Sequence, residues 1–148
     1  MRTRIIIIIK LLFFSTLCFS QNNNEFTSIP VDRINGFYAT TNYYTGIDFE
    51  NIKLTEVPDI TISDISNIKK SLNYHGKPTL NITLTKEAGE KFYTLTEKNV
   101  SKPIAIVVNK KIISMPIVFS PISEGNLVLD GISEEEIDTI IETLTIEE

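Results

Sequence analysis

The most constraining feature of this 148-residue chain is a change of hydrophobic period at Thr85. Residues 79–85 alternate apolar and polar side chains, which predicts a strand with one buried face and one solvent-facing face. From Lys86 to about Lys98 the apolar side chains recur at helical spacing instead, and Thr85 occupies the position of an N-cap. The chain therefore joins a strand directly to an amphipathic helix, which indicates a fold that mixes both kinds of element.

A second strand is predicted at residues 104–108, where Ile-Ala-Ile-Val-Val forms an almost continuous apolar run. A short run rich in β-branched residues is typical of a strand that is covered on both faces. Asn109 and Lys110 follow as a tight turn, so residues 111–115 are expected to return as the second strand of a hairpin.

Residues 63–69 are predicted to form a short helix or turn, with Ser63 as its N-cap. The apolar residues behind this prediction lie three or four positions apart: Ile62, Ile65, Ile68 and Leu72. Residues 75–78 are expected to form the turn that leads into the strand at 79–85. The stretch 47–59 is the least regular part of the chain, and only a short strand at 52–56 is expected there.

The last predicted helix has the clearest start signal. Ser133 as N-cap and Glu136 three residues later form a capping box after Gly131. One face of this helix is apolar through Ile137, Ile140, Ile141 and Leu144. Shorter strands are expected at residues 37–44, 117–119 and 127–129. The predicted fold class is α+β: a mainly antiparallel sheet with two principal helices packed on one face.

The first twenty residues have the pattern of a secretory signal peptide. Arg2 and Arg4 precede an apolar stretch, and the small residues Cys18 and Ser20 stand at the −3 and −1 positions of a cleavage site. The expected organisation is a signal peptide at 1–20, a flexible leader at 21–35 and a single domain at 36–148. The expected location is the periplasm or the medium outside the cell.

Two alternatives to a signal peptide cleaved after Ser20 remain open for this segment. An uncleaved membrane anchor would need about 20 apolar residues, whereas residues 5–19 are fewer and include Lys10. Lipid attachment at Cys18 would normally require a small residue immediately before the cysteine, and Leu17 stands there. Both patterns argue against an anchor, so no membrane span is expected after cleavage.

The charge of the chain restricts its partners. Removal of residues 1–20 takes away three basic residues and no acid, which changes the net charge from −5 to −8. Counterion release cannot drive nucleic-acid binding by a chain of this charge, and an anionic bilayer would repel it as a whole. Nucleic acid is therefore not an expected partner.

No group of residues indicates a catalytic, cofactor or metal site. His75 is the single histidine and has no sequence neighbour that would orient it as a base. Helix capping and the helix dipole account for the acidic cluster at 134–138, which also lacks the spacing of a calcium loop. No phosphate-binding glycine motif is present. We therefore expect no enzyme activity, no cofactor and no metal.

The second half of the chain resembles the first periplasmic (head) domain of the SecD/SecDF family, most strongly over residues 60–145. The matching pieces occur in the family's order: Ile62-Ser63-Asp64-Ile65, Gly76 to Leu84, a helix with Gly89, Phe92 and Thr96, the strand Ile104 to Val108, Ile112 to Pro116, Gly125, and Gly131-Ile132-Ser133. The turn between the two later strands reads Asn109-Lys110 where the family has Asp-Gly or Asn-Gly.

This resemblance implies the head-domain fold and a tendency to contact polypeptides. SecD and SecDF couple proton flow to protein export through carboxylates in a bundle of transmembrane helices. No transmembrane bundle is expected after residue 20 of this chain, so proton-driven transport is not expected of it. The resulting hypothesis is a non-catalytic exported domain that binds a polypeptide or an envelope protein at a sheet edge or beside the Asn109-Lys110 hairpin. The alternative is a small periplasmic hydrolase or ligand-binding enzyme that uses His75. Neither hypothesis specifies an oligomeric state.

Overall fold

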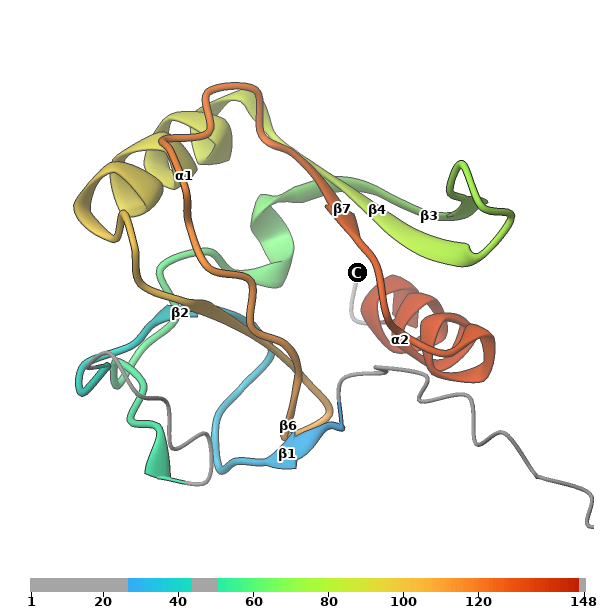
Figure 1. The fold of residues 1–148 in the computed structure, drawn as a ribbon, viewed down its shortest axis with the longest axis horizontal. Coiled ribbons are helices and arrows are strands. Elements are labelled where there is room, and N and C mark those ends of the chain that lie inside the picture. The colour runs from blue at the N-terminus through green and yellow to red at the C-terminus, as the bar shows by residue number, and fades with distance from the viewer. Residues whose placement is uncertain (1–26, 44–50, 147–148) are drawn as a thin grey trace, which may run out of the picture.

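The computed structural model describes residues 27–43 and 51–146, which form two antiparallel sheets and two helices (Figure 1). The four-stranded sheet has the order β1-β6-β5-β2, and the three-stranded sheet has the order β3-β4-β7. The strands are β1 (Ile29–Pro30), β2 (Gly36–Ala39), β3 (Ile65–Leu72), β4 (Pro78–Leu84), β5 (Ile104–Val108), β6 (Lys111–Ser114) and β7 (Asn126–Leu129). The helices are α1 (Lys86–Lys98), α2 (Glu134–Ile146) and the short 3-10 helix η2 (Ile62–Asp64). The α+β class is confirmed, with the antiparallel strands divided between two sheets.

The main hydrophobic core lies between the two sheets and includes both helices. Strand β4 supplies Leu80, Ile82 and Leu84 to this core, and α1 and α2 bury their apolar faces in it. Helix α2 packs against β3 and β4, and α1 packs against β4. In Figure 1, α1 lies at one end of the three-stranded sheet and α2 lies beneath its other end.

Strand β5 is buried on both faces, as its continuous apolar sequence predicts. Ile104, Ile106 and Val108 face the main core. Ala105 and Val107 face a second, smaller core on the other side of the four-stranded sheet. Both sets of side chains are withdrawn from water, which explains why the sequence of this strand shows no polar alternation.

The hairpin between β5 and β6 is confirmed, and its turn has the left-handed geometry of a tight hairpin. Asn109 has φ 51° and Lys110 has φ 57°, the conformation that a two-residue type I′ turn requires. The Asn109 amide also donates to the Thr143 hydroxyl of α2 over 2.8 Å. A side-chain bond to the neighbouring helix thus holds a turn that contains no glycine.

The helix predicted at residues 63–69 is wrong. Only η2 is helical, and the chain then enters β3. The reason is a register shift in the pairing of β3 with β4: Ile65 pairs with Leu84, and Ile68 pairs with Ile82. The extra residue of the bulge places two isoleucines three positions apart on the same face, which imitates the period of a helix.

The N-caps of both helices are confirmed. The Thr85 hydroxyl accepts a hydrogen bond from the Ala88 amide, and the Ser133 hydroxyl accepts one from the Glu136 amide. Each bond satisfies one of the N–H groups that a helix leaves unpaired in its first turn.

The irregular segments have less strand than the sequence predicts. Residues 52–56 contribute a single bridge between Leu54 and Thr40, and residues 117–119 a single bridge between Ile117 and Pro103. The signal-peptide prediction at 1–20 and most of the leader lie outside the described residues. Neither α1 nor α2 has the combination of length and apolarity that a membrane-crossing helix needs.

Candidate functional site

A cavity of about 240 Å³ lies between α1, β5 and the segment that connects β6 to β7. Its lining is almost entirely apolar and consists of Phe37, Phe92, Thr96, Ile104, Ile106, Pro116, Ile117, Val118, Phe119, Ser120, Ile122 and Leu127. We call it the α1 pocket. These residues come from five separate parts of the chain, so the pocket exists only in the folded protein.

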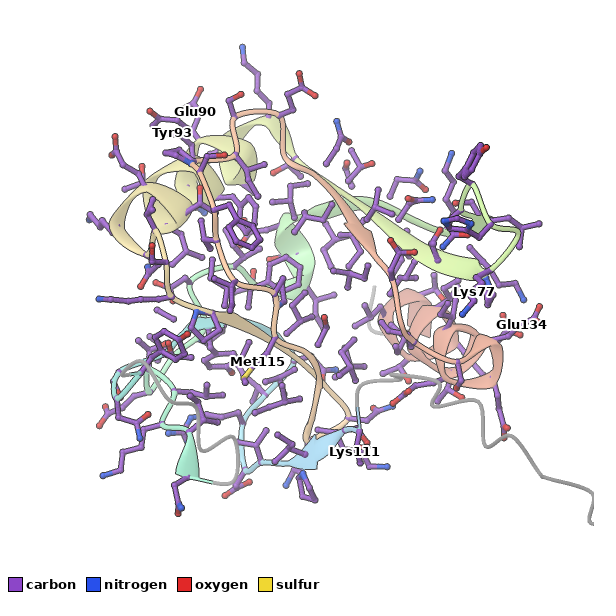
Figure 2. The ribbon with its side chains drawn as sticks, in the orientation of Figure 1. Lys77, Glu90, Tyr93, Lys111, Met115 and Glu134 are labelled. Atoms are coloured by element: carbon purple, nitrogen blue, oxygen red, sulfur yellow. The ribbon has the colours of Figure 1, made fainter. Side chains whose placement is uncertain are left out.

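One face of α1 forms the wall of this pocket and holds the connecting segment. Phe92 lines the pocket, and its ring lies edge-on to Phe37 with centroids 6.1 Å apart. Thr96 is fully buried, and its hydroxyl accepts a hydrogen bond from the Ile122 amide over 3.0 Å. The same hydroxyl donates to the carbonyl groups of Phe92 and Tyr93 within the helix. On the opposite face of α1, Glu90 and Tyr93 point outward (Figure 2).

The connecting segment meets the start of α1 at two glycines. A side chain at Gly125 would place its Cβ 3.2 Å from the Cα of Gly89, and the backbone of Gly125 has φ +61°. Both facts favour glycine at position 125. One face of α1 therefore contacts the connecting segment or the pocket beside it through three residues. Gly89 meets Gly125, Phe92 lines the pocket, and Thr96 bonds Ile122.

The rim of the α1 pocket exposes apolar side chains to solvent. Phe119 is 88% exposed and Ile117 is 37% exposed, although both line the pocket. Val100 is also exposed, and its neighbour Ser101 bonds directly to the connecting segment at Val118. An exposed phenylalanine at the rim of an apolar cavity is typical of a binding surface rather than of a closed core.

The groove beside the Asn109-Lys110 hairpin has a different character. It has a volume of about 700 Å³, and most of the residues that line it have polar side chains: Asp32, Arg33, Ile34, Asn35, Thr61, Ile62, Ser63, Asn109 and Lys110. Its two cationic side chains already have partners. The Arg33 guanidinium donates to the carbonyl groups of Thr55 and Asp32, and Lys110 lies 3.4 Å from the Asp32 carboxylate. The hairpin groove is therefore less suited than the α1 pocket to an apolar side chain.

Ionisable groups mainly tether elements to one another. Although burial favours the neutral acid, hydrogen bonds from the Thr61 amide and hydroxyl, together with Lys91, lower the pKa of Asp64. Hydrogen bonds to Asp138 and Glu134 raise the pKa of Lys70. The first set connects η2 with α1, and the second connects β3 with α2.

His75 lies on the exposed turn between β3 and β4. Its ring contacts Tyr74 edge-on at 5.2 Å, and within the described residues no carboxylate bonds to it. Of the residues in the acidic cluster, Glu134 and Asp138 bond Lys70. No group of three or more metal-ligating side chains occurs in the described ranges.

Sequence reasoning missed the α1 pocket. Phe37, Phe92 and Phe119 are far apart in the chain, and an apolar residue carries no local sign that it faces a cavity. The available signal was the helix motif Gly89, Phe92 and Thr96, whose members meet the connecting segment or line the pocket.

Comparison with known proteins identifies the family. The sequence profile of the SecDF P1 head subdomain matches residues 40–144. The chain belongs to the SecDF P1 head family. The SecD/SecDF resemblance of the sequence is thereby confirmed.

Individual relatives agree with this assignment. The SecD subunit of the protein translocase of Thermobaculum terrenum is 37% identical over 92 residues, which are 62% of this chain and 18% of that protein. The SecDF subunit of Thermus thermophilus is 29% identical over 79 residues, 53% of this chain and 11% of that protein. The chain thus spans less than a fifth of the length of these relatives.

Solved structures show the same fold. A structure of SecDF, described as a membrane component that enhances protein export, has a TM-score of 0.61 and 21% identity, and the match covers 75% of this chain and 60% of that one. A second SecDF structure, in a super-membrane-facing form, has a TM-score of 0.58 and also 21% identity, with 75% of this chain and 18% of that one covered.

Proposed function

We propose that this chain is a non-catalytic binding domain that holds extended segments of polypeptide by inserting an apolar side chain into the α1 pocket. The observation that carries the proposal is the open apolar cavity with Phe119 exposed at its rim. A cavity of about 240 Å³ has room for one large aliphatic or aromatic side chain, and it offers almost no polar group for a polar ligand.

The family supports polypeptide as the ligand. SecD and SecDF relatives are named as subunits of the protein translocase, and one related structure is described as enhancing protein export. A chain in transit is unfolded and presents apolar side chains that a folded protein would bury. The proposed role is to bind such side chains outside the cytoplasm, where the signal-peptide pattern at 1–20 would direct the domain.

The binding experiment uses the full chain and a reduced, unfolded secretory protein as the probe, with isothermal titration and crosslinking as readouts. We expect association at micromolar to millimolar concentration and crosslinks at the rim of the α1 pocket. Absence of association at near-millimolar concentration would overturn the proposal.

Two variants distinguish binding at the α1 pocket from non-specific binding by exposed aromatic side chains. Phe119→Ser removes the exposed aromatic ring at the rim, and Tyr74→Ser removes an equally exposed ring from the β3–β4 turn. We expect Phe119→Ser to weaken binding about tenfold or more and Tyr74→Ser to leave it unchanged. Equal losses would show that the exposed aromatics act without the pocket.

The alternative hypothesis of an enzyme based on His75 is tested with His75→Ala. A binding domain of the proposed kind retains its affinity for the unfolded probe in this variant, because His75 is not among the residues that line the α1 pocket. Loss of a hydrolase activity in His75→Ala, measured over a broad substrate panel, would instead favour the enzyme.

A further inference from the structure

The further inference concerns the backbone of residues 117–119 and rests on the proposed function. Residues 116–118 pair with the start of β5 and the residues just before it through three hydrogen bonds. The Ile104 amide donates to the Pro116 carbonyl over 3.1 Å, and the Val118 amide donates to the Lys102 carbonyl over 3.0 Å. The Ser101 amide donates to the Val118 carbonyl over 2.8 Å.

These three bonds fix the direction of the neighbouring backbone groups. In a trans peptide the carbonyl and the following N–H point in opposite directions. The Pro116 carbonyl and both backbone polar groups of Val118 point toward residues 101–104. In each of the three peptide units concerned, the partner N–H or carbonyl therefore points away from residues 101–104. The groups that point away are the Ile117 N–H, the Ile117 carbonyl and the Phe119 N–H.

The outward groups are available for a partner. Within residues 27–43 and 51–146, none of the three makes a hydrogen bond. Ile117 and Phe119 are both exposed, whereas Val118 between them is buried. The segment therefore has the alternation of a strand at the edge of a sheet, and its second side is unpaired within the described residues.

The local geometry limits this edge to a few residues. Ser101 has φ 66° and lies with Lys102 opposite the single residue Val118, which is the arrangement of a G1 bulge. Pro116 and Pro121 bracket the segment and have no N–H to donate. The edge can therefore accept a short strand and cannot be extended far at either end.

We infer that Ile117 and Phe119 form a strand-addition site, at which an extended polypeptide pairs its backbone with the edge while it places an apolar side chain in the α1 pocket. An antiparallel guest exchanges two hydrogen bonds with Ile117, and a parallel guest bonds the Ile117 carbonyl and the Phe119 N–H. The occupant is an extended polypeptide because the same segment supplies both the backbone groups and the apolar wall, two features that such a chain matches together.

The first test uses acetylated and amidated heptapeptides of threonine and serine with one central leucine. Two further versions carry a single N-methyl group, one at the leucine and one at the following residue. Because adjacent amides of a strand point to opposite sides, only one of these two methyl groups blocks pairing with the edge. We expect one version to bind the full chain about tenfold more weakly than the unmodified peptide, and the other to bind with equal affinity.

The outcomes separate this inference from the function on which it rests. If the unmodified peptide binds and both methylated versions bind equally well, the strand-addition site is overturned and polypeptide binding by the pocket stands. If the unmodified peptide fails to bind at millimolar concentration, polypeptide binding is overturned, and the strand-addition site with it.

The second test measures amide hydrogen exchange by NMR. In the free full chain the Val118 amide is expected to exchange slowly, and the amides of Ile117 and Phe119 rapidly. Saturating peptide should slow exchange at Ile117, at Phe119 or at both by about tenfold or more, with Val118 as the internal control. Slow exchange at Ile117 and Phe119 without peptide would show that the edge is already covered and would overturn the inference.

Discussion

The two helices of this head domain bury faces of different kinds. Helix α2 buries an aliphatic face through Ile137, Ile140 and Leu144. The buried face of α1 includes a glycine and a threonine, Gly89 and Thr96, beside its apolar residues. The aliphatic face closes the core, whereas the mixed face leaves room for a loop and supplies the hydroxyl that anchors it. The difference shows how one helix can close the core while the other leaves room for the α1 pocket.

The largest expected effect is on stability and tests the role of α2. Ile137 is fully buried, so Ile137→Ala leaves a cavity and should lower the free energy of unfolding by about 2–5 kcal/mol. Denaturant unfolding measures this loss, with the exposed Thr139→Ala on the same helix as a control that changes it by less than about 0.5 kcal/mol. Peptide affinity of the folded variant should be unchanged. A large loss of affinity would contradict the division between the helices.

The next effect tests the anchoring hydroxyl of α1. Thr96→Val keeps the shape of the side chain but leaves the Ile122 amide without its acceptor, which should cost about 1–3 kcal/mol of unfolding free energy. Because the connecting segment forms the pocket wall, affinity for the unfolded probe should fall as well. Thr94→Val removes a similar hydroxyl from the exposed side of the same helix and is the matched control. Equal effects of the two variants would show that the hydroxyl does not position the segment.

A pair of glycine variants tests how closely the segment approaches α1. Gly125→Ala should lower the unfolding free energy by about 1–2 kcal/mol, because the left-handed backbone and the contact at 3.2 Å both oppose a Cβ. At Gly89 an added Cβ would meet its nearest atom at an ordinary 3.8 Å. Gly89→Ala should therefore stabilise the helix by about 0.5–1 kcal/mol. Thermal unfolding measures both, and destabilisation by Gly89→Ala would mean that the approach is tighter than the structure shows.

The smallest effect concerns the polar tethers of the two helices. The pKa of Asp64 is lower in the folded than in the unfolded chain, so its stabilising effect is present above its unfolded pKa of about 3.9 and is lost as the pH falls through the lowered folded value. Urea unfolding from pH 7 to pH 2.5 should show the wild type losing its advantage over Asp64→Asn below about pH 4. A difference that stays constant with pH would contradict this assignment. Lys70→Met, at the exposed tether of α2, should have a smaller effect still, because solvent screens an exposed ion pair.

Local signals in the sequence predicted most of the fold. The change of period at Thr85, the apolar run at 104–108 and the cap at Ser133 each depend on neighbouring residues, and the structure confirms all three. The prediction for β3 was wrong because the spacing of its isoleucines depends on a bulge in its pairing with β4. That bulge has no local sequence signal near Ile65.

The candidate site was less predictable for a physical reason. The hairpin groove could be predicted from the sequence because the two residues of its turn are adjacent. The partners of Arg33 and Lys110 could not be predicted, because they come from tertiary contacts. The α1 pocket requires Phe37, Ile104 and Phe119 to meet, and no periodicity reports a space that several side chains leave unfilled. Cavities of this kind follow from packing and become visible only once the fold is known.

The two prolines that bracket residues 117–119 have a consequence for the behaviour of the protein in concentrated solution. A long open strand edge with apolar side chains invites copies of a protein to stack into fibrils. Pro116 and Pro121 interrupt the donor row on each side, so any pairing between two copies is limited to a few residues and is weak. Under the proposed function, the same interruption would restrict a guest chain to a short paired stretch and therefore to brief binding.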